Sequence, residues 1–354
     1  MKIAVFTLSD HYNQGNRLQN YALRHVLQQY GHEVSTYSAY PVKILAYVLP
    51  LALKLPNPPM FKRMRRFLAF TNQNLGGYTP IDFYSKKKLD SLKNQYDVFL
   101  AGSDQIWNPA YAQVPYAYFL QFADRDKTIA YAPSFGTDKI NKHWEKIIEN
   151  GVKHIKYLSV REEDGAKIIT KSSKHIIPPP SVVLDPTLLL TKDEWMEFAT
   201  EPIKKPKKKY ILSYLIPNKN KNKKIARKIA KECGLELVEI NNAKEKYYLS
   251  TPSEFISLIS DAEFVCTSSF HGHALSVILE KPFVTIPNTQ SPDSRIATLL
   301  NTIGISDRNY ATLSREDYAA LDYTEARERL RQKREQSLSF LTTSLEKIEK
   351  GSRA

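Results

Sequence analysis

The sequence predicts an α/β protein in which two domains, each with a mainly parallel sheet, face a cleft and are followed by a C-terminal helix. The chain has 354 residues, more than a single ordinary hydrophobic core holds together. Apolar strand-like segments alternate with helical segments, as in parallel sheets that helices cover on both faces. A lysine- and proline-rich segment at 200–210 interrupts this alternation, which then restarts. These three observations predict the fold class.

The first half of the chain contains the elements of one α/β domain. KIAVFTL at 2–8 predicts a buried strand. The helix after it places Leu18, Ala22 and Val26 on one face because they stand four residues apart, and Gly31 follows where a C-cap is expected. Further strands are predicted within EVSTYSA (33–39), YDVFLAGSD (96–104), KTIAYAPSFG (127–136), IKYLSV (155–160) and SVVLDPTLLLT (181–191).

The second half repeats the pattern and ends in a charged tail. Strands are predicted at 210–216, 235–240, in the segment that ends at Cys266, and at 281–286, with helices at 223–234 and 253–262 between them. The tail at 325–350 predicts a helix. We therefore expect an N-terminal domain at 1–205 with a basic and aromatic insertion at 41–84, a second domain at 206–322, and a helical tail at 323–354.

Composition narrows the class of protein. The formal net charge of +14 permits attraction to anionic lipid, nucleic acid or a phosphorylated substrate, although runs such as KKPKKKY and NKNKNKK are usually solvated loop and helix surface. The two cysteines support neither a disulfide framework nor a zinc site, and the N-terminus does not read as a signal peptide, which together predict a cytoplasmic protein.

An apolar segment at 43–67 raises the question of membrane contact. Pro50 interrupts it and it stops at Pro56, well short of the roughly 20 residues that a spanning helix needs. It predicts a core or lid helix; the alternative is a peripheral patch on the inner face of the plasma membrane. That alternative rests on the basic residues that follow apolar ones directly: Lys62, Arg63, Arg65 and Arg66.

Polar turns follow the predicted strands. In a parallel sheet these turns share one edge, so SDHYNQGNR, AGSDQ, APSFG, SVREE and SSFHGH are expected to line one groove. A helix beginning at Gly272 would offer its N-terminus to a phosphate or carboxylate, and His271 just before it could donate a hydrogen bond or a proton. The glycine-rich motifs of nicotinamide and nucleoside-triphosphate binding are missing from the sequence, and no metal-binding motif appears, so no metal and no cofactor are expected.

Five of these segments, in this order, resemble the polysaccharide pyruvyl transferases: NQGNRLQNYAL, VFLAGSDQIWNP, SVREEDGAKII, VLDPTLLL and SSFHGHALSVILEKPFV. The resemblance extends from Met1 to about Arg308. It implies two Rossmann-like domains of the GT-B type and transfer of pyruvate from phosphoenolpyruvate onto sugar hydroxyls, usually as a ketal. The implied acceptor is a bacterial surface polysaccharide or its lipid-linked precursor, modified at the cytoplasmic face of the membrane.

The resemblance also implies site residues. The family pattern of arginine, apolar residue, histidine and glycine falls on Ser269, Phe270, His271 and Gly272, so the histidine carries over and the arginine does not. Catalytic roles are implied for His271 and Arg161. Donor contacts are expected from Ser268, Ser269, Gly272, His273 and Arg295, the last as a substitute for the missing arginine. Contacts with the acceptor or the cleft are expected from Asn16, Arg17, Gln19, Ser103 and Asp104.

Other interpretations of the same residues stay open. His271 could cap a helix, His273 could pack inside one, and Arg161 could pair with a neighbouring glutamate. Ser103 and Asp104 are good N-cap residues, and Asp185 before Pro186 is typical of a turn. The rival function is a GT-B glycosyltransferase with a nucleotide-sugar donor, because fold does not fix function. A non-catalytic polyanion-binding protein is a third hypothesis, but no nucleic-acid-binding motif is present and no nucleic acid is expected.

Overall fold

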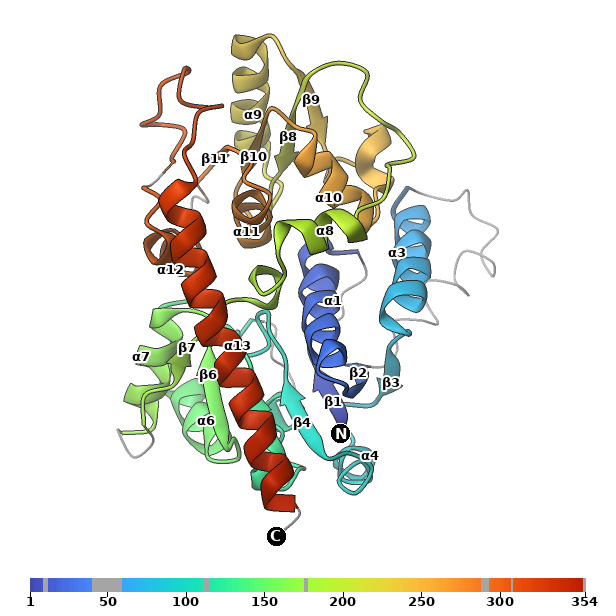
Figure 1. Ribbon diagram of the computed structural model, residues 1–354, viewed down its shortest axis with the longest axis vertical. Helices are drawn as coiled ribbons and strands as arrows, with labels where there is room; N and C mark the ends of the chain where they lie inside the picture. The colour runs from blue at the N-terminus through green and yellow to red at the C-terminus, as the bar shows by residue number, and fades with distance from the viewer. Residues whose placement is uncertain are drawn as a thin grey trace. The chain divides into compact units, whose positions relative to one another are not determined.

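The structure is a computed structural model that describes residues 1–8, 12–39, 59–110, 115–174, 178–287, 293–306 and 308–352. The chain forms two compact units. Unit 1 comprises Met1–Tyr47, Thr71–Leu189 and Gln332–Ala354, and unit 2 comprises Val48–Phe70 and Leu190–Arg331. The lysine-rich segment at 200–210 therefore belongs to unit 2. Two helices, α3 (Pro59–Leu75) and α13 (Thr324–Ser352), pass from one unit into the other (Figure 1).

Unit 1 is built on a seven-stranded, all-parallel sheet of order β3-β2-β1-β4-β5-β6-β7. The strands are β1 (Lys2–Phe6), β2 (Glu33–Ala39), β3 (Thr79–Ile81), β4 (Val98–Ala101), β5 (Thr128–Ala130), β6 (Tyr157–Val160) and β7 (Ser181–Val182). The chain leaves β1 in one direction and β4 in the other, which makes the gap between these two strands the topological switch point. Ligands of open parallel sheets bind outside such a point, at the carboxyl ends of the strands.

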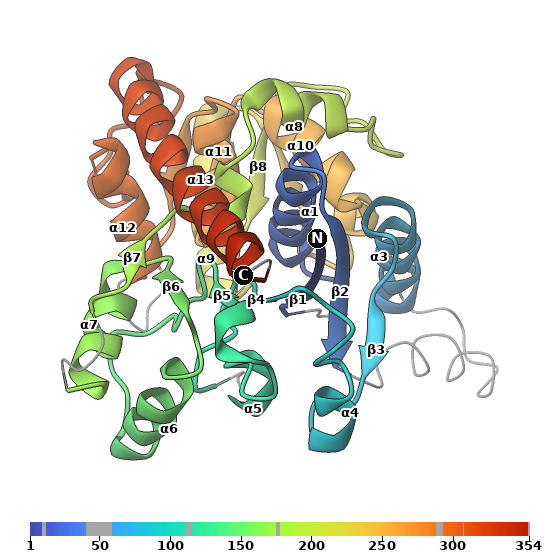
Figure 2. The ribbon, with the colours of Figure 1, turned by 60° about the horizontal axis from the view of Figure 1, so that its bottom comes forward.

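Helices cover both faces of this sheet. Figure 2 shows α1 (Gln14–Gln29) and the second half of α13 on one face, with α5 (Pro115–Tyr118), α6 (Lys142–Val152) and α7 (Glu163–Ser172) on the other. The remaining short elements are α4 (Lys86–Asp90), η1 (Arg125–Lys127) and η2 (Pro186–Leu188). The prediction for α1 is confirmed: Leu18, Ala22 and Val26 are buried, and Gly31 ends the helix with a φ of +78°.

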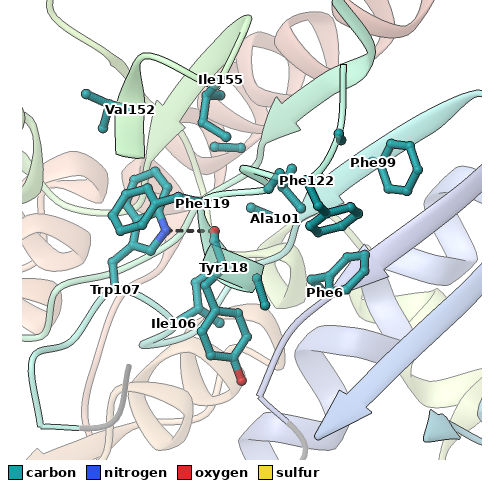
Figure 3. Close-up of a cluster of buried hydrophobic side chains, with 14 of the residues drawn as sticks. Phe6, Phe99, Ala101, Ile106, Trp107, Tyr118, Phe119, Phe122, Val152 and Ile155 are labelled. Carbon is teal, nitrogen blue, oxygen red and sulfur yellow. Dashed lines mark hydrogen bonds between the residues drawn. The ribbon is translucent and has the colours of Figure 1, made fainter. Parts of the chain in front are cut away.

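Aromatic side chains form much of the core of unit 1 (Figure 3). The Trp107 ring stacks on Phe119 at 4.8 Å between centroids, and its indole Nε1 donates to the Tyr118 carbonyl at 3.1 Å. A buried indole N–H needs such a partner. Phe6 and Phe99 from the central strands both pack on Phe122. Phe6 is the last residue of β1, and the segment that carries Trp107 follows β4, so this core lies at the carboxyl ends of both strands.

Unit 2 has a smaller parallel sheet of order β11-β10-β8-β9. Its strands are β8 (Tyr210–Tyr214), β9 (Glu236–Glu239), β10 (Phe264–Thr267) and β11 (Phe283–Thr285), and its helices are α8 (Lys192–Phe198), α9 (Asn220–Cys233), η3 (Lys246–Leu249), α10 (Pro252–Ser260), α11 (Phe270–Ile278) and α12 (Ser294–Ile303). On one face α9 packs Ala226 and Ile229 into a cluster with Cys266. On the other, Phe255 of α10 contacts Tyr214 at 4.7 Å between ring centroids.

The described part of the insertion, residues 59–84, contains α3 and also β3, which is a strand of the unit 1 sheet. Two arginines of α3 bind to unit 2. Arg63 is only 2% exposed; it donates to the Ile240 carbonyl at 3.0 Å and lies 4.5 Å over the Tyr248 ring. Arg66 pairs with Glu254 at 2.8 Å. These two arginines therefore form no exposed basic patch for a membrane. Residues 40–58 of the insertion lie outside the described residues.

The two parallel α/β sheets and the C-terminal helix α13 confirm the predicted fold class. The cleft between the domains and the boundaries at 205 and 322 stay predictions. No described helix combines the length and the apolar character that crossing a bilayer requires.

The two cysteines differ in burial, and we therefore expect them to differ in reactivity towards thiol reagents. Cys266 lies in β10 with no exposed surface, and its burial raises the pKa of its thiol well above the ordinary value. Cys233 is only partly buried. Because the thiolate is the reactive form, a thiol reagent at about pH 8 should modify Cys233 alone in the folded protein and Cys266 only after unfolding. Fast labelling of a folded Cys233→Ser protein would contradict this packing.

Candidate active site

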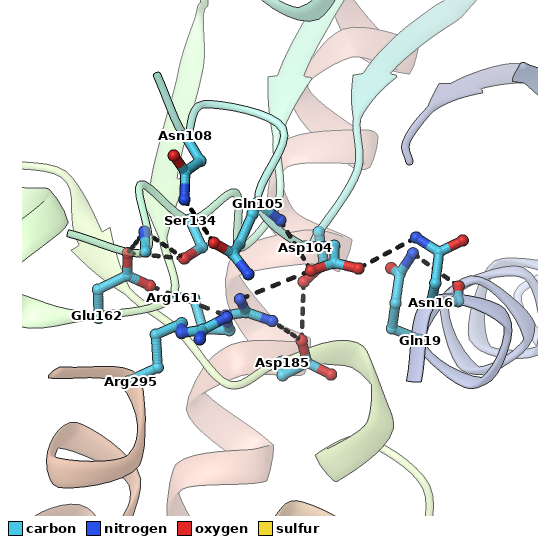
Figure 4. Close-up of polar contacts among 12 residues, drawn as sticks. Asn16, Gln19, Asp104, Gln105, Asn108, Ser134, Arg161, Glu162, Asp185 and Arg295 are labelled. Atoms are coloured by element: carbon cyan, nitrogen blue, oxygen red, sulfur yellow. Dashed lines mark hydrogen bonds and ion pairs between the residues drawn. The ribbon is translucent and has the colours of Figure 1, made fainter. Parts of the chain in front are cut away.

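Polar side chains from four predicted turns converge at the carboxyl ends of the unit 1 strands (Figure 4). Asn16 lies in the first turn of α1, the helix that follows β1; Asp104 follows β4, Ser134 follows β5, and Arg161 with Glu162 follows β6. All five are buried. For unit 1, the expectation that these turns share one edge is confirmed. Residues 9–11 of the first turn lie outside the described residues.

Arg161 is the centre of this network. Its guanidinium Nη1 donates to Asp185 Oδ2 at 2.6 Å, and further guanidinium nitrogens lie 3.9 Å from Asp104 and 3.8 Å from Glu162. The residue is 4% exposed. A buried guanidinium is costly unless carboxylates compensate it, and here three surround it. The sequence allows Arg161 to pair with a neighbouring glutamate; the contact with Glu162 is present and is buried.

Asp104 occupies a strained position at the switch point. Its φ is +71°, a left-handed value that a residue with a Cβ adopts at a cost. Asn16 Nδ2 donates to its Oδ2 at 3.1 Å, and the N–H of Gln105 donates to its Oδ1 at 2.8 Å. Asp104 is not an N-cap of any described helix. Non-glycine residues with such backbone angles are concentrated at functional sites.

Asp185 and Glu162 tie the strand ends together. Asp185 accepts from Ser103 Oγ at 2.9 Å and also caps η2 by accepting from the N–H of Thr187 at 3.0 Å. The sequence predicts Asp185 as a turn residue, and it is one, but the sequence does not indicate that it is also the partner of Arg161. Glu162 accepts from Ser134 Oγ at 2.8 Å and from the N–H of Phe135 at 2.9 Å.

The residues of α1 contribute amides rather than exposed charge. Gln19 Nε2 donates to Thr7 Oγ1 at 3.0 Å, and Thr7 in turn donates to the Ser103 carbonyl at 2.9 Å. Arg17 is 5% exposed; it donates to Asn16 Oδ1 and lies 5.1 Å over the Tyr78 ring. Arg17 therefore orients Asn16, the residue that holds Asp104.

Taken together, the network has three carboxyl groups around one guanidinium. An added phosphate or carboxylate would compete with Asp185 for Arg161 and would face Asp104 and Glu162 at short range. Hydroxyl groups suit the same surroundings, because carboxylates and amide oxygens accept hydrogen bonds from them. Unit 1 thus favours a neutral, hydroxyl-rich ligand.

The second group of predicted residues follows β10 in unit 2. Ser269 is the N-cap of α11 with an extended φ of −98°, so the helix begins at Phe270 and not at Gly272 as expected. His271 is consequently inside the first turn. Gly272 serves a contact instead: a Cβ there would lie 2.2 Å from Thr267 Oγ1. The glycine lets α11 lie directly on the end of β10.

The first turn of α11 has the character of an anion seat. An α-helix leaves its first N–H groups without partners among its own carbonyls, and its N-terminus carries partial positive charge. The Ser269 side chain does not cap these groups. Ser268 Oγ is held by the N–H of Ile216 at 3.0 Å, which fixes the turn at the switch point between β8 and β10. His271 is part of this turn and is only 6% exposed.

His273 and Arg295 have protein partners. His273 Nδ1 lies 2.8 Å from the Ser269 carbonyl, which requires Nδ1 to be the donor, and Nε2 lies 3.0 Å from Thr285 Oγ1. It packs edge-on to Phe283, which matches the interpretation that it packs inside the helix. Arg295 forms a two-point pair with Asp293, whose carboxylate offsets its charge. The donor roles of both residues stay predictions.

The structure thus brings the predicted residues together in two separate groups. In unit 1 these are Asn16, Arg17, Gln19, Ser103, Asp104 and Arg161; in unit 2 they are Ser268, Ser269, His271, Gly272 and His273. Sequence reasoning gave no site role to Thr7, Ser134, Glu162 and Asp185, although each stands in or just after a predicted strand segment, which is the signal that could have found them. Among the described residues, no group of three or more histidine, cysteine, aspartate or glutamate side chains is placed to hold a metal ion.

A model of the polysaccharide pyruvyl transferase family matches residues 13–290, most of the chain and both groups of site residues. The chain belongs to the polysaccharide pyruvyl transferase family. It is therefore a member of a transferase family, as its motifs predict. A comparison of this family member with curated proteins found no match.

Solved structures resemble the chain in fold. A putative UDP-N-acetylglucosamine 2-epimerase from Listeria monocytogenes is 10% identical with a TM-score of 0.53, covering 98% of this chain and 90% of its own. The UDP-GlcNAc 2-epimerase from Neisseria meningitidis, bound to UDP-GlcNAc, is 12% identical with a TM-score of 0.50, covering 99% and 100%. At such identities the likeness concerns the fold alone. It agrees with the predicted GT-B-like architecture of the family member.

Replacing Gly272 by alanine should disturb the turn. The new Cβ would collide with Thr267 Oγ1, so we expect Gly272→Ala to lower the free energy of unfolding by about 1–3 kcal/mol in denaturant titrations. Gly351→Ala is the matched control, because a Cβ there meets nothing within 4 Å. Thr267→Ala should relieve part of the loss, whereas Thr267→Ser keeps the Oγ and should not. Equal stability of Gly272→Ala and wild type would contradict the contact.

Removing Arg161 should be costly because it leaves buried carboxylates uncompensated. We expect Arg161→Ala to lower the free energy of unfolding by about 3–5 kcal/mol near neutral pH. Lys171→Ala, which breaks an exposed pair with Glu145, should change it by less than about 1 kcal/mol. Combining Arg161→Ala with Asp185→Asn should restore part of the loss. Additive effects of the two substitutions would show that the pair is not coupled.

Proposed function

We propose that this chain transfers the pyruvyl group of phosphoenolpyruvate onto sugar hydroxyls of a bacterial surface polysaccharide or its lipid-linked precursor, forming a pyruvate ketal. The family match over residues 13–290 carries the proposal. The geometry supports a different substrate for each unit. Unit 2 is proposed to bind the donor, because the start of α11 suits an anion, and unit 1 the acceptor, because its polar network suits hydroxyl groups.

The donor defines what its seat must supply. Phosphoenolpyruvate carries a phosphate and a carboxylate, and the first turn of α11 provides N–H groups and the positive end of a helix dipole. Ser268, Ser269 and Gly272 shape this turn, and His271 adds an imidazole within it. Helix N-termini stabilise negative charge that develops on a leaving group. We propose His271 as a donor-binding and proton-transferring residue, and no cofactor or metal is part of the proposal.

The proposed reaction balances with the groups available. A proton adds to C3 of the enol while one sugar hydroxyl oxygen bonds to C2 and loses its proton. The C2–O bond to phosphate then breaks, inorganic phosphate leaves with one proton, and a second hydroxyl bonds to C2 and loses its own. The two hydroxyl protons match the proton gained at C3 and the proton carried by phosphate. General acid and base groups typically contribute about 10²–10⁴-fold each to such a transfer.

Unit 1 is proposed as the acceptor side. Asp104, held by Asn16 and the N–H of Gln105, is oriented to accept a hydrogen bond from a sugar hydroxyl. The predicted catalytic role of Arg161 stays a proposal, but its 2.6 Å pair with Asp185 requires a donor anion to compete for it. Its alternative role is to hold Asp104 and Asp185 in place. The proposal places the reaction in the cytoplasm, where phosphoenolpyruvate is available.

The first experiment is a thermal shift with phosphoenolpyruvate, compared with uridine and guanosine diphosphate sugars, inorganic phosphate and pyruvate. A ligand that binds only the folded state at about 100 times its Kd stabilises by about 2.7 kcal/mol. We expect phosphoenolpyruvate alone to raise Tm, and His271→Ala to abolish the rise while leaving the ligand-free Tm close to wild type. His143→Ala, at an exposed position of α6, is the matched control.

The two hypotheses for the donor give opposite outcomes in this experiment. Stabilisation by a nucleotide sugar and not by phosphoenolpyruvate would replace the proposal with a glycosyltransferase. If pyruvyl transfer is reconstituted with an acceptor, His271→Ala should lower kcat by about 10²–10⁴-fold. A fully active His271→Ala enzyme would exclude His271 from the chemistry.

A further inference from the structure

The positive charge of this protein is concentrated in one short part of the sequence. Residues 203–231 contain twelve lysine and arginine residues and no aspartate or glutamate. The formal net charge of the whole chain is +14, so the rest of the chain is nearly neutral. Charge that is confined to one segment points to a partner surface rather than to a general solubility effect.

The helix α9 presents much of this charge to solvent as a stripe. Its inner side packs Ala226 and Ile229 on the unit 2 sheet. Four lysines stand at intervals of three, four and three residues, which places them along one side of the helix. These exposed residues are Lys221, Lys224, Lys228 and Lys231.

A basic loop lies beside the end of this helix. Lys204, Lys205, Lys207, Lys208 and Lys209 are all exposed in the segment that enters β8. The N–H of Glu236 donates to the Lys209 carbonyl at 3.1 Å, and Glu236 follows the Gly234 cap of α9 by two residues. The loop and the end of α9 therefore lie together, at the end of unit 2 opposite the start of α11 (Figure 1). We call this surface, residues 203–209 and the outer side of α9, the basic face.

Few acidic groups neutralise the basic face. Lys205, Lys209 and Lys228 pair with neighbouring carboxylates. Within the described part of the chain, six other lysines of the face form no ion pair: Lys204, Lys207, Lys208, Lys221, Lys224 and Lys231. The basic loop also exposes an apolar side chain, since Ile203 is 66% exposed directly before Lys204.

We propose that the basic face docks unit 2 onto an anionic lipid bilayer. The negative surface potential of such a bilayer attracts lysine side chains, and an exposed isoleucine beside them can enter the interface between headgroups and acyl chains. A nucleic acid is the less suitable partner, because the tyrosines of this segment, Tyr210 and Tyr214, are buried in β8 and offer no surface for base stacking. Docking goes beyond the proposed pyruvyl transfer and does not depend on the donor.

The test is co-sedimentation of the purified full chain with vesicles. We expect binding to vesicles with about 30 mol% phosphatidylglycerol, little binding to pure phosphatidylcholine, and weakening as salt shortens the screening length. The variant K207Q/K208Q/K224Q/K231Q should bind at least about 100-fold more weakly, because each lysine near an anionic surface contributes to the partition coefficient. Ile203→Ser should weaken binding by about tenfold with no change of charge.

A matched variant separates the face from net charge. K87Q/K139Q/K142Q/K146Q removes the same charge from exposed lysines of unit 1 and should bind like wild type. Equal losses in both quadruple variants would overturn the proposal, as would unchanged binding of the first variant. Binding to duplex or single-stranded DNA without binding to anionic vesicles would overturn it in favour of a nucleic acid. Because vesicle binding is measured without phosphoenolpyruvate, its failure is distinct from failure of the proposed reaction.

Discussion

The buried guanidinium of Arg161 constrains the carboxyl edge of the unit 1 sheet. A charge that is 4% exposed persists only if carboxylates surround it, and the three that do so come from the ends of β4, β6 and β7. Each carboxylate then needs further donors, which Asn16, Ser103 and Ser134 supply. The strand-end turns are therefore fixed relative to one another by one connected set of polar contacts, and the strained backbone of Asp104 is held within it.

Unit 2 fixes its turn by close packing instead. Gly272 allows α11 to lie against Thr267, and Thr267 Oγ1 bonds both the Tyr214 carbonyl and the N–H of Ser269. A helix start held this firmly costs little reorganisation when an anion binds. The two units thus offer opposite environments at equivalent places of two parallel sheets, a carboxylate-rich edge in unit 1 and a helix N-terminus in unit 2. This contrast agrees with a transfer between an anionic donor and a neutral sugar.

The exposed positive charge lies away from the strand-end turns. The edges that are proposed to bind substrates contain few exposed lysines, while the outer side of α9 and the loop before β8 contain most of the excess positive charge. Two arginines of α3, by contrast, have partners within unit 2. Arg63 contacts the Ile240 carbonyl and the Tyr248 ring, and Arg66 pairs with Glu254. A basic sequence is therefore not by itself a basic surface, because a guanidinium can be satisfied inside the fold.

The sequence by itself determined the parallel α/β architecture, the helix register of α1, and the family, because apolar periodicity and motif order are local properties of the chain. It also placed the polar turns of unit 1 at one edge, since parallel strands share an orientation. Only the tertiary structure decided that Arg161 pairs with Asp185, which lies 24 residues away along the chain. Likewise, the burial of Arg63 depends on Ile240, 177 residues distant. Such contacts join residues far apart in the chain, and no local pattern encodes them.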